Sequence, residues 1–396
     1  MDKKTIRDIE IKDKRVLVRV DLNVPMDEIT GQITDETRIT AIIPTIEYLL
    51  EKRAKIILCS HLGRPKGNVV ESMRLAPVAK RLSEILGLPV KTTDGCVGPQ
   101  VEEAVSQMSP GDIMLLENLR FHAGEEKNDS AFAKRLDDLA DLFVNDAFGV
   151  AHRAHASTVG VTEHIPAVGG LLIEKEIEML HKALDVPERP LTTIVGGAKV
   201  SDKIMLIDHM LNKVDNLLVG GGMVSTFLKA LGYEIGNSLV EPDKIELAKK
   251  LMQKAKESKT NLVLPADLIV ADKFDKYASI AIVPVKRIPK ARIVMDIGPK
   301  TVDAFSRIIN NSKTILWNGP MGVFEYSKFS KGTKDIANLL ADMDAITIIG
   351  GGSTSEAVDS LGLASKMVHV STGGGASLKL LEGSPLPGFE ALLDKE

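Results

Sequence analysis

Short apolar runs alternate along this chain with longer segments in which apolar residues recur at helical spacing. This alternation predicts an α/β protein whose sheets are largely parallel and whose strands are buried on both faces. A small hairpin is expected within residues 272–283. The runs that we expect to form strands are residues 15–20, 55–59, 112–116, 142–144, 191–195, 216–219, 261–264, 292–295, 314–317, 345–349 and 367–370.

The longer segments carry one apolar face each and predict helices. One is expected over residues 39–50, kinked early by Pro44, and another over 75–86, ended by Gly87. Residues 171–184 predict a single long helix between the two halves. We therefore expect two Rossmann-like parallel-sheet domains of similar size, residues 1–170 and 171–382, joined by this helical hinge.

Composition excludes several classes of protein. The chain has 396 residues, of which 44% are apolar and 26% charged, with a net charge of −4. This is globular composition, and a mildly acidic chain is poorly suited to general nucleic-acid or membrane-surface binding. No apolar run approaches a membrane span, and the first residues do not resemble a signal peptide. Cys59 and Cys96 are too few for a disulfide framework or zinc site, so we expect a cytoplasmic protein.

Polar and basic side chains follow the expected strands of the first half. Ligands of open α/β sheets bind beyond the carboxyl ends of the strands, so these side chains are expected to converge. Arginine forks match phosphate and carboxylate oxygens, which favours a small, multiply charged anion over a set of separate solvated residues. The converging cations are expected to be Arg38, His61, Arg64, Arg120 and Arg153.

Glycines follow the expected strands of the second half, which holds 20 of the 32 glycines. Such loops let backbone N–H groups approach phosphate oxygens, and five of them indicate a nucleotide-sized polyphosphate. Lys199 and Lys203 are expected on one face of the helix after the first loop, where an anion would stabilise a cation in the first turn. The five loops are Gly196–Gly197, Gly220–Gly222, Asn318–Gly322, Gly350–Gly352 and Gly373–Gly375.

Several common motifs are absent from the sequence. It contains no Walker A loop, no G-x-G-x-x-G fingerprint, no G-x-S-x-G and no H-E-x-x-H. A nicotinamide dehydrogenase therefore fits the α/β pattern but lacks its fingerprint. The histidines have no metal-like spacing, and ordinary hydrogen-bonding roles are expected for them.

Seven segments together resemble the phosphoglycerate kinase family, in the family's order and across essentially the whole chain. They are RVDLNVP (19–25), SHLGRP (60–65), ENLRFHAGEE (117–126), NDAFGVAHRAHAS (145–157), GGAKVSDK (196–203), WNGPMGVFE (317–325) and STGGGASL (371–378). The resemblance implies reversible phosphoryl transfer between ATP and 3-phosphoglycerate, giving ADP and 1,3-bisphosphoglycerate. It also implies that the tail, about residues 383–396, returns to the first domain.

The resemblance assigns roles to individual residues. Those implied to bind phosphoglycerate are Asp21, Asn23, Arg38, His61, Leu62, Gly63, Arg64, Arg120 and Arg153. Those implied to bind the nucleotide are Gly197, Lys203, Gly298, Asn318, Pro320, Val323, Glu325, Gly351, Gly352, Ser353 and Thr354. Those implied to act on the transferred phosphoryl group are Arg38, Lys199, Gly373, Gly374 and Gly375.

The chemistry of this reaction suits such residues. A carboxylate nucleophile is already ionised at pH 7, so no general base is needed. The protein then has to position the reacting groups and neutralise their charge. The two anion sites lie in different halves, so we expect the domains to close about residues 171–184 and exclude water.

One position departs from the family. The family usually has an aspartate at position 353 that helps to hold the Mg²⁺ of the nucleotide, and this chain has Ser353. We expect Mg²⁺ to arrive on ATP or ADP and to be held mostly by phosphates.

Two alternatives stay open at this point. Another small-molecule kinase could use the same scaffold, and a catalytically silent homologue could bind nucleotide only. The expected partners are small molecules, without nucleic acid or membrane, and a monomer is expected.

Overall fold

The structure is a computed structural model, and its description covers residues 2–27 and 29–395. The chain divides into two compact units, which we call unit 1 (Met1–Glu178 with Pro385–Glu396) and unit 2 (Met179–Ser384). The division falls inside helix α7 (Leu171–Asp185), some way after the residue 170 expected from the sequence. Residues 385–395 lie in unit 1, where the Gly388 N–H donates to the Ala151 carbonyl at 2.8 Å.

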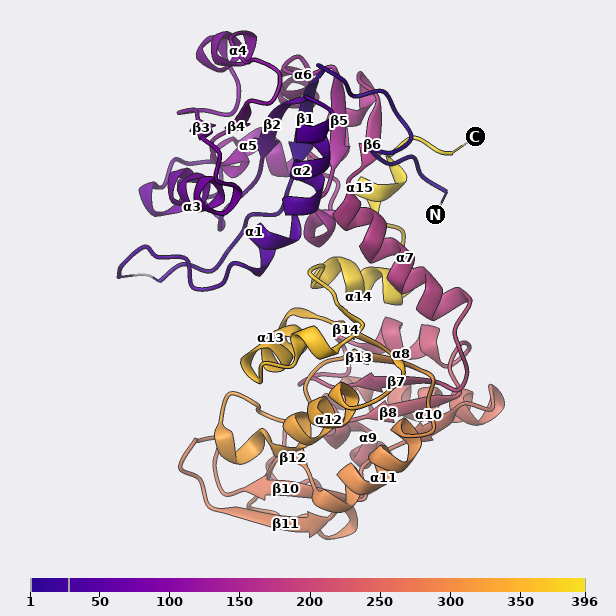
Figure 1. The fold of residues 1–396 in the computed structure, drawn as a ribbon. Coiled ribbons are helices and arrows are strands. Elements are labelled where there is room, and N and C mark those ends of the chain that lie inside the picture. Colours follow the sequence, from indigo (N-terminus) through magenta and orange to yellow (C-terminus); the bar gives the residue numbers. More distant parts are fainter. Residues whose placement is uncertain (1, 28, 396) are drawn as a thin grey trace. The chain divides into compact units, whose positions relative to one another are not determined.

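Unit 1 is built on a six-stranded sheet in the order β3-β4-β2-β1-β5-β6, with every pair parallel (Figure 1). The apolar runs predicted four of these strands closely. β3 and β6 were not predicted, because three residues are too few to show a period. The strands are β1 (Arg15–Arg19), β2 (Lys55–Cys59), β3 (Val90–Thr92), β4 (Ile113–Leu115), β5 (Leu142–Asn145) and β6 (Ala167–Gly169).

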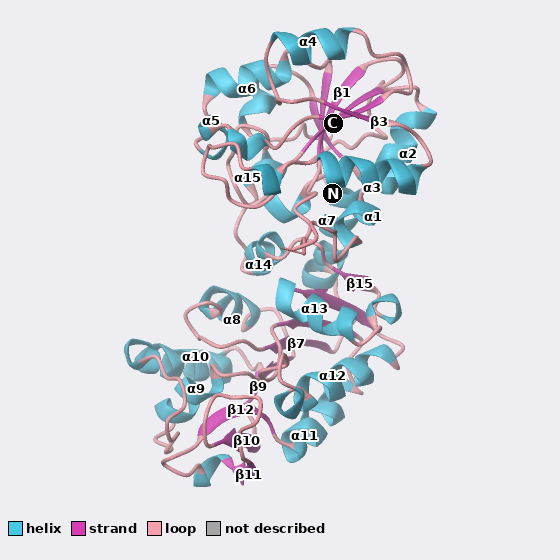
Figure 2. Cartoon of the chain, turned by 90° about the vertical axis from the view of Figure 1, so that its left-hand side faces the viewer, coloured by secondary structure: helices cyan, strands magenta, loops and turns pink. Residues whose placement is uncertain are grey.

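Helices cover both faces of this sheet because its strands are apolar on both sides (Figure 2). Val16 and Val18 of β1 pack in one core with α2 and α3, whereas Leu17 packs in another with α4 and α6. The break expected at Pro44 is present, since α1 ends at Ala41 and α2 begins at Ile43. The helices are α1 (Thr37–Ala41), α2 (Ile43–Glu51), α3 (Ala76–Leu86), α4 (Pro99–Ser106), α5 (Ala123–Glu126), α6 (Ser130–Asp137) and α15 (Pro387–Glu390).

Unit 2 contains a parallel six-stranded sheet in the order β15-β14-β13-β7-β8-β9. Its central strands are buried along their whole length, as the continuous apolar runs predicted. The strands are β7 (Leu191–Val195), β8 (Asn216–Val219), β9 (Asn261–Val263), β13 (Thr314–Asn318), β14 (Ile346–Gly350) and β15 (His369–Val370).

A separate antiparallel sheet, in the order β11-β10-β12, completes unit 2. The hairpin predicted within residues 272–283 is wrong in its bounds. Its strands are β10 (Asp267–Ala271) and β11 (Ile280–Pro284), and most of the predicted segment is the connection between them. Asp272 and Asp275 hold that connection by accepting backbone N–H groups of Ser279 and Tyr277. The expected strand at 292–295 is β12 (Ile293–Ile297), which belongs to this small sheet.

Helices also lie on both faces of the parallel sheet of unit 2 (Figure 2). One core joins Ile194 and Trp317 of the sheet to α11, α12 and α13. The helices are α8 (Ile204–Met210), α9 (Val224–Ala230), α10 (Ile245–Glu257), α11 (Pro299–Ile309), α12 (Lys331–Ala341), α13 (Gly352–Ser360) and α14 (Gly375–Leu381).

Candidate active site

The polar residues expected to converge in unit 1 lie beyond the carboxyl ends of β1, β2, β4 and β5. The carboxylate of Asp21, just after β1, pairs with the guanidinium of Arg38 in α1. Burial alone would raise the pKa of Asp21, but the guanidinium groups of Arg38 and Arg19 and the hydrogen bond from the Asn23 N–H hold it below its usual range. Asp21 is therefore a carboxylate that fixes Arg38 in place.

The loop after β2 is bound to its neighbours through the backbone of Gly63. Its N–H donates to the Asn23 side-chain oxygen at 2.8 Å, and its carbonyl accepts from the Arg120 guanidinium at 2.8 Å. Arg120 is 4% exposed, and burial lowers its pKa while Glu126 opposes this. Leu62 is a core residue whose backbone is held by Asn118. The structure thus brings Asn23, Gly63 and Arg120 together, three residues that the family resemblance implies to bind phosphoglycerate.

His61 is buried among these cations and is held neutral. Burial lowers its pKa well below the usual value, and Arg19, Arg120 and Arg38 act in the same direction against Asp21. One Arg19 nitrogen lies 3.2 Å from the Nδ1 of His61. A guanidinium has no acceptor, so Nδ1 must be the acceptor and Nε2 carries the proton. This arrangement leaves Nε2–H as a donor for an anion.

Arg19 belongs to this cluster, and reasoning from the sequence missed it. It lies inside β1, is 1% exposed, and also donates to the Ser157 hydroxyl at 2.9 Å. That hydroxyl donates in turn to the buried Glu125 carboxylate at 2.6 Å, which balances the Arg19 charge nearby. The sequence signal was available, since an arginine in a strand predicted to be buried on both faces needs a partner.

The two remaining cations are held less tightly. Arg64 is exposed and forms no hydrogen bond or ion pair with residues 2–27 or 29–395. Arg153 is half-buried after β5 and acts electrostatically on Arg120, whose pKa it lowers. Both side chains are thus available to an incoming anion.

Three of the five glycine loops in unit 2 pack against one another. A Cβ at Gly196 would lie 2.1 Å from the Pro320 carbonyl, one at Gly319 2.2 Å from the Gly196 carbonyl, and one at Gly221 2.5 Å from the Gly197 nitrogen. These glycines are therefore required by close approach of backbones. The sequence argument that all five loops serve a polyphosphate is too broad for these three.

The other two glycine loops each hold one glycine with open surroundings. Gly351 has a φ of +91° and is the N-cap of α13, and a Cβ on Gly352 would meet no atom within 4 Å. Gly374 has a φ of +47°, is the N-cap of α14, and is likewise open. Gly373 is buried and Gly375 exposed beside it. Neither helix has an acidic residue in its first turn, so both N-termini are suited to anions.

The expectation that Lys199 and Lys203 share a helix face is wrong. Lys203 is the N-cap of α8, and Lys199 precedes the helix in a loop where Val200 is buried. That loop is held by hydrogen bonds outside a helix, among them the Ser201 N–H to Glu241 at 3.1 Å. Lys199 is exposed and has no ion pair within the described ranges. The Lys203 ammonium donates to the Asn318 side chain, and burial lowers its pKa.

A cavity of about 530 Å³ lies beside these loops in unit 2. Its walls are mainly apolar and aromatic, which suits a planar base and a sugar. Phe274 and Tyr326 form one wall, with ring centroids 5.8 Å apart, and the sequence did not predict them. The lining includes the predicted residues Gly197, Pro320, Val323, Glu325 and Ser353.

Thr354 and Gly298 lie outside that lining and have structural partners. The Thr354 hydroxyl accepts the Gly319 N–H at 2.7 Å, which ties the start of α13 to the loop after β13. A Cβ on Gly298 would lie 2.4 Å from the Asp267 carboxyl group, which itself accepts two N–H groups at the start of α11. Packing therefore explains Gly298 without a ligand.

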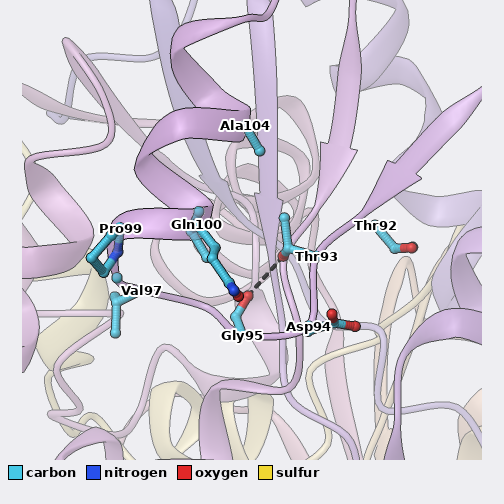
Figure 3. Close-up of a pocket in the computed structure, with 10 residues that line it drawn as sticks. Thr92, Thr93, Asp94, Gly95, Val97, Pro99, Gln100 and Ala104 are labelled. Carbon is cyan, nitrogen blue, oxygen red and sulfur yellow. Dashed lines mark hydrogen bonds between the residues drawn. The ribbon is translucent and has the colours of Figure 1, made fainter.

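A second cavity, of about 520 Å³, lies in unit 1 between the end of β3 and the start of α4 (Figure 3). The Thr93 hydroxyl donates to the Gly95 carbonyl at its edge at 2.7 Å. Asp94 is its charged lining residue, and none of the predicted site residues lines it. It does not match the demands of a multiply charged anion.

Two features of the described residues bear on metals and membranes. Within residues 2–27 and 29–395, no group of three or more His, Cys, Asp or Glu side chains is arranged to hold a metal ion. No helix in these same ranges combines the length and the apolar character needed to cross a membrane.

The chain is similar to known proteins over nearly its whole length. Residues 6–384 match the family model of phosphoglycerate kinase. The chain belongs to the phosphoglycerate kinase family, which is a family of phosphotransferases. Among solved structures, it is similar to phosphoglycerate kinase from Coxiella burnetii, with 41% identity, 98% of each chain covered and a TM-score of 0.88. It is also similar to phosphoglycerate kinase from Pyrococcus horikoshii OT3, with 32% identity, 98% of each chain covered and a TM-score of 0.82. These similarities confirm the predicted α/β fold with two parallel-sheet domains.

Proposed function

We propose that this chain catalyses Mg²⁺-dependent phosphoryl transfer, ATP + 3-phosphoglycerate ⇌ ADP + 1,3-bisphosphoglycerate, as an enzyme of glycolysis. The observation that carries the proposal is the cluster beyond β1, β2 and β4, where Asp21 pairs with Arg38, Arg19 lies against His61, and Arg120 donates to the Gly63 carbonyl. Preordered donors of this kind lower the entropic cost of holding a small polyanion. Membership of the family supports the same reaction.

In this proposal unit 1 binds 3-phosphoglycerate. The exposed Arg64 and half-buried Arg153 supply charge, and the Nε2–H of neutral His61 supplies a directed hydrogen bond. Since Asp21 holds Arg38 by an ion pair, Arg38 is oriented before the substrate arrives. The substrate carboxylate then attacks the terminal phosphorus of ATP, the bond from that phosphorus to the bridging oxygen of ADP breaks, and no proton is transferred.

Unit 2 binds the nucleotide in the same proposal. The base and sugar occupy the apolar cavity against Pro320 and Val323, with Glu325 at the sugar. The phosphates lie at the N-terminus of α13, beside Asn318 and Lys203. Burial lowers the pKa of Lys203, and an anionic phosphate reverses this effect by stabilising the charged ammonium. Lys199 and Gly373–Gly375 neutralise charge on the transferred group.

In this proposal the two substrates bind to different units, so the units must close about α7 for the reaction to occur. Reacting atoms must approach to about 3–3.5 Å in line, and water must be excluded so that ATP is not hydrolysed. We propose hinge closure for this reason, in a cytoplasmic monomer. Cys59 and Cys96 are both free thiols in the structure, which suits a reducing compartment.

The residues around Ser353 do not form a metal site of their own. Its hydroxyl is exposed in the first turn of α13, where no acidic side chain accompanies it. A helix N-terminus favours anions over cations. We therefore propose that Mg²⁺ arrives with the phosphates of the nucleotide, where it neutralises charge.

Ser353→Asp tests this reading of the metal. A carboxylate is a harder, charged ligand, so the Mg²⁺ concentration at half-maximal rate should fall about three- to tenfold. Ser353→Ala is the matched control and should leave the titration within about twofold, because the hydroxyl contributes little. An unchanged titration in Ser353→Asp would contradict a role of position 353 in metal affinity.

The decisive experiment measures ATP consumption with 3-phosphoglycerate, coupled to reduction of the acyl phosphate product, across a Mg²⁺ titration. Turnover that requires both substrates supports the proposal. Nucleotide binding without turnover at saturating Mg²⁺ would instead support a silent homologue, and Ser353 would be the first residue to change.

A further inference from the structure

The chain passes from unit 1 to unit 2 within helix α7. Side chains of unit 1 accept hydrogen bonds from the backbone N–H groups of its first turn. The first N–H groups of a helix have no partner inside it. Here the Leu171 N–H donates to the Thr45 hydroxyl at 3.0 Å, and the Leu172 and Ile173 N–H groups donate to Oδ1 of Asp146 at 2.9 and 3.2 Å. Side chains from two other elements of unit 1 therefore satisfy all three.

Asp146 is itself joined directly to the substrate-binding edge of the sheet. It follows β5, and its N–H donates to the carbonyl of Arg19, the last residue of β1, at 2.8 Å. Arg19 is the residue that orders His61. Asp146 thus forms hydrogen bonds with both the end of β1 and the start of α7.

The fit around this carboxyl group is close. Asp146 and Thr45 are both 0% exposed, and a Cβ on Gly170 would lie 2.2 Å from Oδ1 of Asp146. Glycine at position 170 is therefore what allows the carboxyl group to reach the helix. Burial raises the pKa of Asp146 to about 7, and Glu174 acts in the same direction, whereas hydrogen bonds from Thr45, Ile173 and Leu172 oppose this. A neutral acceptor should consequently serve as well as a carboxylate.

We propose that Asp146 is a positioning residue for phosphoryl transfer, because it fixes the direction in which α7 leaves the substrate-binding edge of unit 1. This inference rests on the proposed function and its hinge closure. With the first turn fixed, closure proceeds about the later part of α7 along one path. With the first turn loose, the two substrates bind but their reacting atoms align less often.

The test compares Asp146→Ala, which removes the acceptor, with Asp146→Asn, which keeps a neutral oxygen acceptor. Asp129→Ala is the matched control, since Asp129 caps α6 through the Phe132 N–H at 2.8 Å, away from both α7 and the proposed ligands. For each protein we would measure kcat, the Kd of 3-phosphoglycerate alone, and the decrease in radius of gyration by X-ray scattering on adding 3-phosphoglycerate with a non-hydrolysable ATP analogue.

Asp146→Ala should lower kcat at least tenfold, leave the Kd of 3-phosphoglycerate within twofold, and at least halve the contraction. Asp146→Asn should stay within about threefold of wild type, and Asp129→Ala should keep wild-type kcat. If Asp146→Ala fails to fold, Thr45→Val, which removes only the Leu171 partner, replaces it and should lower kcat about threefold.

Several results would overturn the inference. One such result is an unchanged kcat and an unchanged contraction in a folded Asp146→Ala protein. If Thr45→Val replaces that variant, the same result in Thr45→Val would also overturn it. A Kd that rises in proportion to the loss of activity would assign Asp146 to the substrate site instead. If the wild-type protein does not contract, there is no domain closure for Asp146 to direct, and the inference fails. Contraction without wild-type turnover would refute the proposed reaction alone, and the contraction of the variants would still decide the role of Asp146.

Discussion

Asp296→Asn should make the stability of unit 2 less sensitive to pH. Asp296 lies in β12, is 1% exposed, and has a pKa raised to about 7, chiefly by burial, although the Gly332 and Ile297 N–H groups oppose the shift. In the unfolded chain, this carboxyl group ionises near pH 4. The folded protein therefore holds a proton that the unfolded chain releases between about pH 4 and 7.

The sign and size of the effect follow from this difference. Below pH 4 the group is protonated in both states and has no effect. As pH rises toward 7, stability falls, because the unfolded state gains from ionisation and the folded state does not. Each tenfold change in proton affinity corresponds to about 1.4 kcal/mol, so the loss approaches roughly 4 kcal/mol above pH 7. Between pH 5 and 8 it amounts to roughly 3 kcal/mol by the same reasoning.

Asparagine is neutral at every pH but replaces one acceptor oxygen with a donor. The two carboxyl oxygens of Asp296 accept from Ile297 and Gly332 N–H groups, both at 2.8 Å, so one of these bonds is lost. That loss lowers stability by about 1–3 kcal/mol at all pH values. Near pH 5 the variant should therefore be less stable than wild type. Between pH 5 and pH 8 the free energy of unfolding of the variant should rise by about 2–3 kcal/mol relative to that of the wild type.

The single tryptophan makes the assay specific. Trp317 is buried in a core of unit 2, and its fluorescence during urea unfolding reports on that unit. Asp146→Asn, in unit 1, is the control and should leave the pH dependence of this transition unchanged. A difference between Asp296→Asn and wild type that stays constant from pH 5 to 8 would refute the reasoning.

Three further predictions concern the proposed sites. Lys203→Met should weaken nucleotide binding roughly tenfold or more, as for loss of a charge-assisted hydrogen bond, and leave 3-phosphoglycerate binding unchanged by calorimetry; weakening of both would contradict it. Arg19→Lys should raise the KM for 3-phosphoglycerate about tenfold, because one ammonium cannot replace the fork on His61 and Ser157. The control is Arg15→Lys, whose half-buried side chain pairs with Asp141, and an unchanged KM in Arg19→Lys would refute this role. Gly196→Ala should lower the urea stability of unit 2 by more than about 3 kcal/mol, because its Cβ meets the Pro320 carbonyl. Gly352→Ala, also in unit 2, open around its Cβ and without a positive φ, is the control and should lose less.

Much of the fold could be predicted because buried parallel strands are continuous apolar runs. Lys55–Cys59, Leu191–Val195 and Asn216–Val219 have the bounds that their runs predicted. Short strands carry no such signal. The hairpin of β10 and β11 was predicted too far along the chain, because Asp267, a buried acid that accepts N–H groups of the first turn of α11, interrupts the apolar run at the start of β10.

The candidate site in unit 1 could be predicted in part from strand order. Because parallel strands end at one edge, Asp21, His61 and Arg120 were expected to meet, and the structure brings them together. The groups that orient them could not be found in this way. Arg19 contacts His61, and the Asp146 N–H donates to the Arg19 carbonyl. Only the register of β1, β2 and β5 decides which side chain or backbone group each one meets.

The glycines of unit 2 show why one sequence pattern carries two meanings. Glycine after a strand permits either approach of a phosphate or approach of another backbone. Gly196, Gly221 and Gly319 serve the second purpose, since a Cβ on any of them would overlap a backbone atom of a neighbouring loop. That packing brings Gly197, Pro320 and Gly221 together as one wall of the cavity. Because this wall is backbone held against backbone, a side chain added at its contacts would move the cavity itself. Gly352 and Gly374 have open surroundings, and they are the glycines to which the proposed function assigns phosphate. The same glycine pattern thus both builds the pocket and leaves the helix N-termini accessible.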